Sequence, residues 1–162
     1  DDKLSLGAAR YGADDRLVDV YRACFPDASA TELAVQIQTD FTFRIPAIRL
    51  AEARLDQPGK TFMYLFAWES RVGHLKSTHA LEIPFVFDNL TAAGVKAFTG
   101  PGEVPQGVAD VMHQAWIDFI RDGNPGWAEY DLQDRPSMRF DTESLVVYDP
   151  DDQKRQAWQG IR

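Results

Sequence analysis

The chain has 162 residues, 44% of them hydrophobic and 12% aromatic, which is the composition of one globular domain with a sizeable core. Its net charge of −8 argues against nucleic acid or an anionic membrane surface as a partner. The single cysteine excludes an intrachain disulfide, and no apolar run reaches the roughly 20 residues that span a bilayer.

The single cysteine also bears on location and chemistry. Cys24 lies between Ala23 and Phe25 in a helical pattern, so we expect a buried, unreactive side chain. The start of the sequence, Asp1–Lys3, does not begin a signal peptide. These features favour a cytoplasmic location, although a signal on upstream sequence stays open.

The first 25 residues are expected to form a loop followed by a helix. Residues Asp1–Asp14 are polar and contain glycine, which favours a loop. Within Asp15–Phe25, apolar residues such as Leu17 and Tyr21 recur at helical spacing. The helix should end before the proline and aspartate that follow.

Two further helices are predicted before residue 60. Ser29 or Thr31 would cap the first of them. The second extends from Phe41 to Leu55 and ends at the sequence Gln57-Pro58-Gly59. Pro46 should lie in the first turn of that helix or kink it, because proline lacks the backbone N–H that a helix interior requires.

The run Thr61–Trp68 predicts a central strand of an α/β protein. Its apolar residues fall on both alternating faces, which is typical of a strand covered on both sides in a parallel sheet. Aromatic residues dominate the run, and this favours a strand over a helix.

A polar loop, Ser70–Thr78, then leads to His79 just beyond the C-terminal end of that strand. Ligands bind and catalytic side chains are presented at this end of open α/β sheets. On residue type alone, a histidine in a loop is more often held by backbone hydrogen bonds. The position favours a catalytic role for His79 over His74 and His113.

The remaining chain predicts a loop, a long helix and a hairpin. Thr91–Gly107 is rich in glycine and proline, which indicates a surface loop. Val108–Ile120 has the clearest amphipathic helical spacing in the sequence, and Gly123 should end that helix. Met138–Phe140 and Leu145–Tyr148 are predicted to pair as a hairpin. A last helical turn, residues 151–158, would pack its tryptophan on the body of the domain.

The other polar and aromatic clusters are expected to have structural roles. No metal site is predicted, since the histidines lack ligand spacing, and the acidic clusters 14–19 and 149–152 lack the pattern of a calcium loop. We expect those clusters to be helix starts and solvated faces. Glu82 would cap the helical turn that begins near His79, or contact the residues that surround the site. Core packing is expected for the aromatic residues Trp116, Phe119 and Trp158.

The segment around His79 carries a family resemblance. His79-Ala80-Leu81-Glu82-Ile83-Pro84-Phe85-Val86-Phe87, behind a Tyr-Leu-Phe-Ala-Trp strand, resembles the catalytic-histidine segment of the type B carboxylesterases, which include the para-nitrobenzyl esterases and cholinesterases. The helix that ends in Gly123-Asn124-Pro125 and the closing pattern through Trp158 are also similar to this family. The order of motifs agrees from Phe41 onward.

The resemblance implies an α/β-hydrolase fold, of which residues 1–162 would be a single C-terminal segment. It implies that His79 is the general acid–base of a serine esterase that acts on small carboxylic esters without a cofactor. Such enzymes carry a Gly-x-Ser-x-Gly nucleophile and an acid upstream of the histidine, and no Gly-x-Ser-x-Gly occurs here. We therefore expect the missing N-terminal part to be the chain's natural partner and the chain alone to be inactive.

Two other classes of function stay open from the sequence. The chain could be part of a cholinesterase-like adhesion or scaffold protein that has lost catalysis, although the presence of His79 weighs against this. It could also be a free-standing interaction domain. If the 162-residue chain exists alone, the strand Thr61–Trp68, which needs neighbouring strands, predicts self-association through exposed strand edges and apolar surface.

Overall fold

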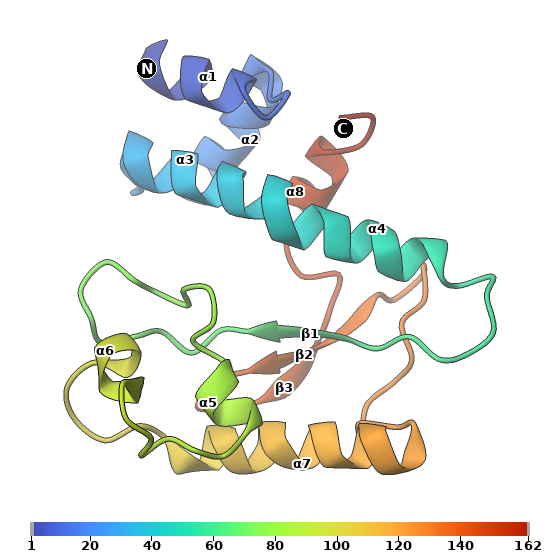
Figure 1. Cartoon of the computed structure of the whole chain (residues 1–162). Coiled ribbons are helices and arrows are strands. Elements are labelled where there is room, and N and C mark those ends of the chain that lie inside the picture. Colours follow the sequence, from blue (N-terminus) through green and yellow to red (C-terminus); the bar gives the residue numbers. More distant parts are fainter. Residues whose placement is uncertain (1, 162) are drawn as a thin grey trace. The chain divides into compact units, whose positions relative to one another are not determined.

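The computed structural model describes residues 2–161, and the chain divides into two compact units. One unit comprises the chain up to Gln57 and again from Pro150, and it is helical. The other comprises Pro58–Asp149 and contains the sheet. Figure 1 labels the elements of both units.

The helical unit is built from both ends of the sequence. Its elements are α1 (Asp2–Ala9), α2 (Asp15–Cys24), α3 (Ala30–Thr39), the π-helix η1 (Asp40–Arg44), α4 (Ile45–Ala53) and α8 (Asp152–Ala157).

The loop predicted over Asp1–Asp14 is wrong for most of its length, because α1 occupies residues 2–9. Asp1 lies outside the described residues. Leu4 and Ala8 stand one helical turn apart and are 3% and 1% exposed, so burial of this pair stabilises the helix. The glycine between them, Gly7, lowers helix propensity, and it hid the pattern.

The predicted starts of the next two helices are confirmed. The Asp14 side chain accepts a hydrogen bond from the backbone N–H of Leu17 at 2.9 Å and so caps α2. Of the two cap candidates for α3, Ser29 is the N-cap, and it forms a capping box with Glu32. Cys24, at the end of α2, is half-buried instead of buried, and its Sγ lies 3.7 Å from Oε1 of Gln153.

Helices α3 and α4 are joined through η1 without a loop (Figure 1). The backbone N–H of Ile45 reaches the carbonyl of Asp40, which is the wide spacing of a π-helix. Pro46 lies in the first turn of α4, as predicted. A π turn just before the proline removes the need for the N–H that proline lacks.

A buried polar network connects α8 to α2 and η1. The Tyr21 hydroxyl donates to Oδ2 of Asp40 at 2.5 Å and accepts from Nε1 of Trp158 at 2.8 Å. Nζ of Lys154 lies 3.5 Å from the same Asp40 oxygen, and the Lys154 and Asp40 side chains are only 6% and 3% exposed. Burial and the Asp40 carboxylate raise the pKa of Tyr21. Trp158 is 1% exposed, which confirms its predicted packing.

The second unit contains a three-stranded sheet of order β1-β2-β3, formed by β1 (Met63–Phe66), β2 (Pro136–Phe140) and β3 (Leu145–Tyr148). β1 and β2 are parallel, with Tyr64 beside Met138. β2 and β3 form the predicted antiparallel hairpin. The other elements of this second unit are α5 (Ile83–Val86), α6 (Val95–Thr99) and α7 (Gln106–Asp122).

The strand predicted over Thr61–Trp68 exists, but its regular part is shorter and the described residues cover only part of it. Within the described residues it lies at an edge of the sheet, paired only with β2. Tyr64 is 36% exposed, so the described residues do not cover β1 on both faces. The residues described here supply one parallel neighbour and not two.

Helix α7 lies along one face of the sheet (Figure 1). It extends through the predicted range and ends at Gly123, whose φ of +67° is the left-handed conformation that glycine adopts freely. The core joins α5, α7 and β2 through Trp68, Leu81, Phe85, Val108, Ala109, Met112, Ala115 and Phe140. The predicted loop Thr91–Gly107 holds the short helix α6 and the first residues of α7.

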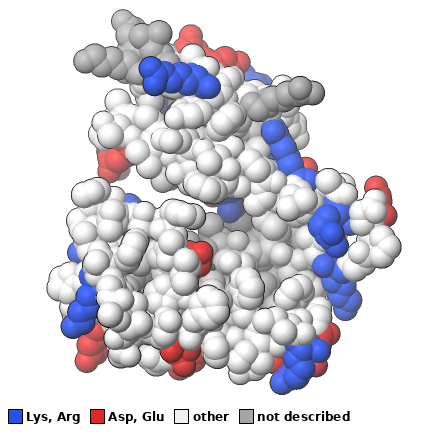
Figure 2. Space-filling view, in the orientation of Figure 1, with Lys and Arg blue, Asp and Glu red and all other residues white. Residues whose placement is uncertain are grey.

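None of the helices in the described residues is long and apolar enough to cross a membrane. Figure 2 shows both acidic and basic side chains on the visible face.

The buried network of Tyr21, Asp40, Lys154 and Trp158 is expected to contribute to the free energy of unfolding. Asp40→Ala should lower the free energy of unfolding by about 3 kcal/mol, because it removes the buried carboxylate that the Tyr21 hydroxyl and the Lys154 ammonium share and leaves Lys154 with only the partly exposed Asp151 at 3.2 Å. Adding Lys154→Met should recover most of that loss, because a buried apolar side chain needs no partner. Urea unfolding followed by circular dichroism measures both.

The matched control for this network is Asp19→Ala. Asp19 pairs with Arg22 at 3.2 Å, but the two side chains are 71% and 39% exposed. The loss should be below about 0.5 kcal/mol. Equal effects of Asp40→Ala and Asp19→Ala would contradict the assigned role of the network.

Candidate active-site histidine and the neighbouring groove

His79 lies just beyond the C-terminal end of β1. Trp68 anchors the start of the connecting loop and is 6% exposed. The loop closes on itself, since the backbone N–H of Ser70 donates to the carbonyl of Lys76 at 3.0 Å. The Ser77 hydroxyl donates to the carbonyl of Trp68, also at 3.0 Å. These bonds return the chain to the end of the strand two residues before His79.

A tight turn presents the His79 side chain to solvent. The backbone N–H of Leu81 donates to the carbonyl of Thr78 at 3.1 Å, which closes a turn with His79 and Ala80 at its centre. Ala80 has a φ of +69°, a left-handed conformation that is strained for any residue with a Cβ. Leu81 and Phe85 are fully buried and fix the turn to the core, whereas His79 is exposed.

The other two histidines have different surroundings. His74 is exposed in the loop that precedes His79. His113 is half-buried on α7, and its Nδ1 lies 2.7 Å from the carbonyl oxygen of Val86. Because a carbonyl only accepts, Nδ1 carries the proton and donates it, and this bond links α7 to α5.

An open groove of about 370 Å³ lies between α5 and α7 at the β1 side of the sheet. Its lining is mostly apolar, and Glu82 and His113 are the exceptions besides the Tyr64 hydroxyl. The lining residues are Tyr64, Glu82, Ile83, Val86, Phe87, His113, Trp116, Ile117 and Ile120.

The prediction that Trp116 and Phe119 belong to the core is wrong. They are 38% and 43% exposed. Helix α7 buries Val108 and Met112 against the sheet and α5, so the C-terminal part of the apolar stripe turns toward the surface. Ile117, outside the predicted stripe, was the signal in the sequence that the apolar face of α7 is wider than one buried side.

Glu82 does not cap the helix that it precedes. It is the N-cap residue of α5, and its side chain makes no capping hydrogen bond there. The side chain lines the groove instead. Burial and the negative charge of Glu82 together raise the pKa of Tyr64.

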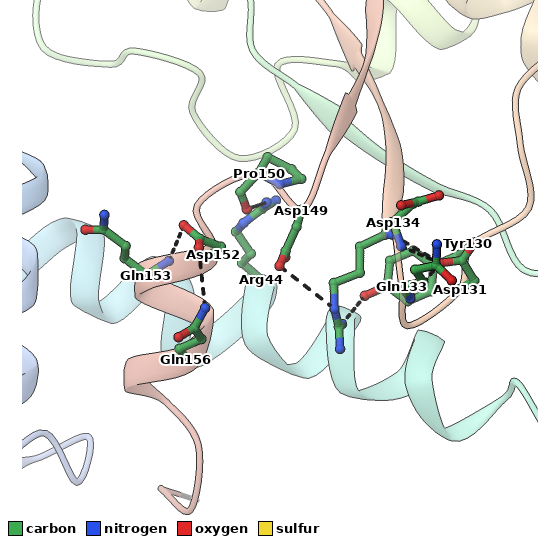
Figure 3. Close-up of polar contacts among 11 residues, drawn as sticks. Arg44, Tyr130, Asp131, Gln133, Asp134, Asp149, Pro150, Asp152, Gln153 and Gln156 are labelled. Atoms are coloured by element: carbon green, nitrogen blue, oxygen red, sulfur yellow. Dashed lines mark hydrogen bonds and ion pairs between the residues drawn. The ribbon is translucent and has the colours of Figure 1, made fainter.

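The acidic segments serve as helix starts and ion-pair partners. In the helical unit, Asp152 lies in the first turn of α8 and bonds the backbone N–H of Gln153 at 2.7 Å (Figure 3). In the sheet unit, Asp149 lies 4.0 Å from the Arg135 guanidinium. Among residues 2–161, no three His, Cys, Asp or Glu side chains are grouped to hold a metal ion.

Comparison with known proteins identifies the family. The model of the carboxylesterase family matches residues 15–158. The chain belongs to the carboxylesterase family. It is 31% identical over 131 residues to the para-nitrobenzyl esterase of Bacillus subtilis (strain 168), and the match covers 77% of this chain and 27% of that esterase. It is 28% identical to the phenmedipham hydrolase of Pseudarthrobacter oxydans, with coverages of 85% and 28%.

Solved carboxylesterases confirm the fold class. The chain superposes on carboxylesterase EST55 of Geobacillus stearothermophilus with a TM-score of 0.78 and 33% identity, over 90% of this chain and 32% of EST55. These esterases are α/β-hydrolases, and the three-stranded sheet with its helices is part of that fold. The chain spans between about a quarter and a third of the length of these relatives.

The groove predicts that Glu82→Gln lowers the pKa of Tyr64. The carboxylate disfavours the negative phenolate, so the neutral amide should move the pKa back toward its ordinary value, while burial keeps part of the increase. Tyrosinate absorbance measured against pH detects the change, and Tyr64→Phe assigns the signal. Glu69→Gln serves as the control and should leave the titration unchanged.

The turn predicts that Ala80→Gly stabilises the protein. Glycine adopts a φ of +69° without a steric penalty, so the free energy of unfolding should rise by about 1 kcal/mol. The matched substitution Ala23→Gly, on the exposed side of α2, should lower it by about 1 kcal/mol. A loss of stability in Ala80→Gly would show that the turn is not strained.

Proposed function

We propose that this chain carries the general acid–base histidine of a serine carboxylesterase, and that His79 is this residue. The observation that carries the proposal is the exposed His79 on a tight turn directly after β1, in a chain of the carboxylesterase family. A side chain at this end of a sheet is accessible to substrate, while its backbone is fixed by the buried Leu81.

In this role His79 takes the proton of a serine hydroxyl as the oxygen attacks the ester carbonyl. The histidine then returns the proton to the departing alcohol, and it repeats both steps with water to release the acid. An imidazole has an ordinary pKa of about 6.5, so both protonation states are accessible near neutral pH.

The nucleophile and the triad acid are proposed to come from residues outside this sequence, upstream of His79. Two findings support this: no Gly-x-Ser-x-Gly occurs in the 162 residues, and α/β-hydrolases order their triad as serine, acid and histidine along the chain. The relatives are also three to four times longer than the part they share with this chain. Residues 1–162 would then be the C-terminal segment of the esterase domain.

The substrate class that fits is a small carboxylic ester. Proteins similar to this chain are named para-nitrobenzyl esterase and carboxylesterase, which supports ester hydrolysis as the reaction. The proposal requires no cofactor, since the proton transfers and the covalent acyl intermediate use side chains alone.

The proposal predicts that the 162-residue chain alone does not hydrolyse para-nitrophenyl acetate above the buffer rate. A polypeptide that also contains the nucleophile-bearing part should hydrolyse the ester. His79→Ala in that polypeptide should lower kcat by at least about a thousandfold, because the serine loses its base. Release of nitrophenolate measures the rate.

His74→Ala is the control, because His74 is exposed in the same loop five residues earlier. It should change kcat by less than about twofold. Equal losses in the two variants would count against His79 as the base. Turnover by the 162-residue chain alone that disappears in His79→Ala would overturn the assignment of the nucleophile to other residues.

A further inference from the structure

The loop between β1 and His79 has little hydrophobic anchoring of its own. Among residues 69–80 only Ser70 is buried, at 8% exposed, and the other side chains are half-buried or exposed. Serine is mostly found on protein surfaces, and a buried hydroxyl is nearly always hydrogen-bonded. A buried serine in an otherwise open loop therefore indicates a specific contact.

Ser70 and its neighbour join this loop to the C-terminal end of α6 (Figure 1). The Ser70 hydroxyl donates to the carbonyl of Phe98 and accepts from the backbone N–H of Val72 at 2.9 Å. The backbone N–H of Arg71 donates to the carbonyl of Thr99 at 3.0 Å, and Thr99 is 1% exposed. The last carbonyls of a helix have no partner within the helix. The loop therefore supplies the donors that the end of α6 needs.

Gly100 allows the two backbones to approach this closely. It is buried, and its φ of +82° and ψ of −168° define a conformation that is essentially restricted to glycine. A Cβ at this position would lie 2.7 Å from the carbonyl carbon of Arg71 and 2.9 Å from the backbone nitrogen of Val72. Both distances are shorter than van der Waals contact, so a side chain at Gly100 would push the loop away from α6.

The contact between the loop and α6 encloses His79. From Ser70 the chain passes through His79 and α5 to α6, and the bond between Ser70 and Phe98 joins residues 28 positions apart. Leu81 and Phe85 anchor the segment after His79 in the core. The backbone of His79 is thus held from both sides, because the core fixes the residues after it and α6 fixes the loop before it.

We propose that Ser70 and Gly100 are positioning residues for His79, an inference that rests on the proposed role of His79 as the base. By holding the loop on α6, they keep the imidazole where it can take a proton from the serine. A base acts only within hydrogen-bond reach of the hydroxyl, and a displacement of about 1 Å costs roughly a hundredfold in rate. Both segments of the contact lie inside the sheet unit, so the described residues make it entirely.

Fluorophosphonate labelling of the longer polypeptide that contains the nucleophile, followed over time by intact mass, tests the proposal. Ser70→Ala removes the hydroxyl and Gly100→Ala displaces the loop, and each should lower the second-order rate constant of labelling about tenfold or more, because the serine meets its base less often. The final extent should stay at one adduct per polypeptide. A variant that only lost folded protein would show the reverse, a lower extent at an unchanged rate.

Turnover of para-nitrophenyl acetate gives a second readout. Ser70→Ala and Gly100→Ala should lower kcat by a similar factor and change KM by less than about twofold, because the base acts in the chemical steps and not in substrate binding. If Gly100→Ala does not fold, Ser70→Ala decides the question alone, because it adds no atoms.

Gly94→Ala is the matched control. Gly94 precedes the first residue of α6 with a φ of +90°, and no atom beyond its chain neighbours lies within 4 Å of a Cβ added there. The substitution therefore strains the same helix without pushing on the loop. It should lower the melting temperature but leave the labelling rate and kcat within about twofold of the unchanged polypeptide.

Two contrary results have different meanings. If His79→Ala labels as fast as the unchanged polypeptide, His79 is not the base, and the positioning role is overturned with it. If His79→Ala abolishes labelling while Ser70→Ala and Gly100→Ala label at the unchanged rate, His79 stays the base. The contact with α6 would then serve stability alone, and the positioning role of Ser70 and Gly100 would be overturned.

Discussion

The parallel pairing of β1 with β2 determines where this chain presents chemistry. Parallel strands end at the same edge of a sheet, so the loop after β1 emerges where ligands reach an α/β protein. Two hydrogen bonds at the base of that loop return the backbone to the strand, and the turn after it places His79 in solvent. Helix α7 packs against Phe85 of α5 and Phe140 of β2 and so fixes the turn and the sheet to the same core.

The sequence was sufficient to predict the elements whose signals are local. The helix that starts at Asp15, the long helix that ends at Gly123 and the hairpin of β2 and β3 each follow from nearby residues, and each is confirmed. The family and fold were also predictable, since the segment His79–Phe87 carries a specific order of residue types, and the comparisons confirm both. The catalytic role of His79 stays a prediction.

The features that the sequence did not reveal depend on what packs against each side chain. The α1 helix was missed because burial of Leu4 and Ala8, and not local propensity, stabilises it. The pairing of β1 with β2 was not predictable either, because apolar residues on both faces show that a strand prefers burial but not which segments cover it. The prediction that Trp116 lies in the core was wrong for the same reason, because helical spacing does not distinguish a helix side that packs in the core from one that stays exposed.

The central claim is that His79 is the base of a serine esterase, and labelling with a fluorophosphonate probe followed by intact-mass analysis tests it most directly. The probe reacts only with a serine that a neighbouring base has activated. The source polypeptide should gain one adduct on a serine outside residues 1–162, and His79→Ala should abolish it. A serine that labels equally well in His79→Ala, or a source polypeptide that does not label at all, would contradict the account.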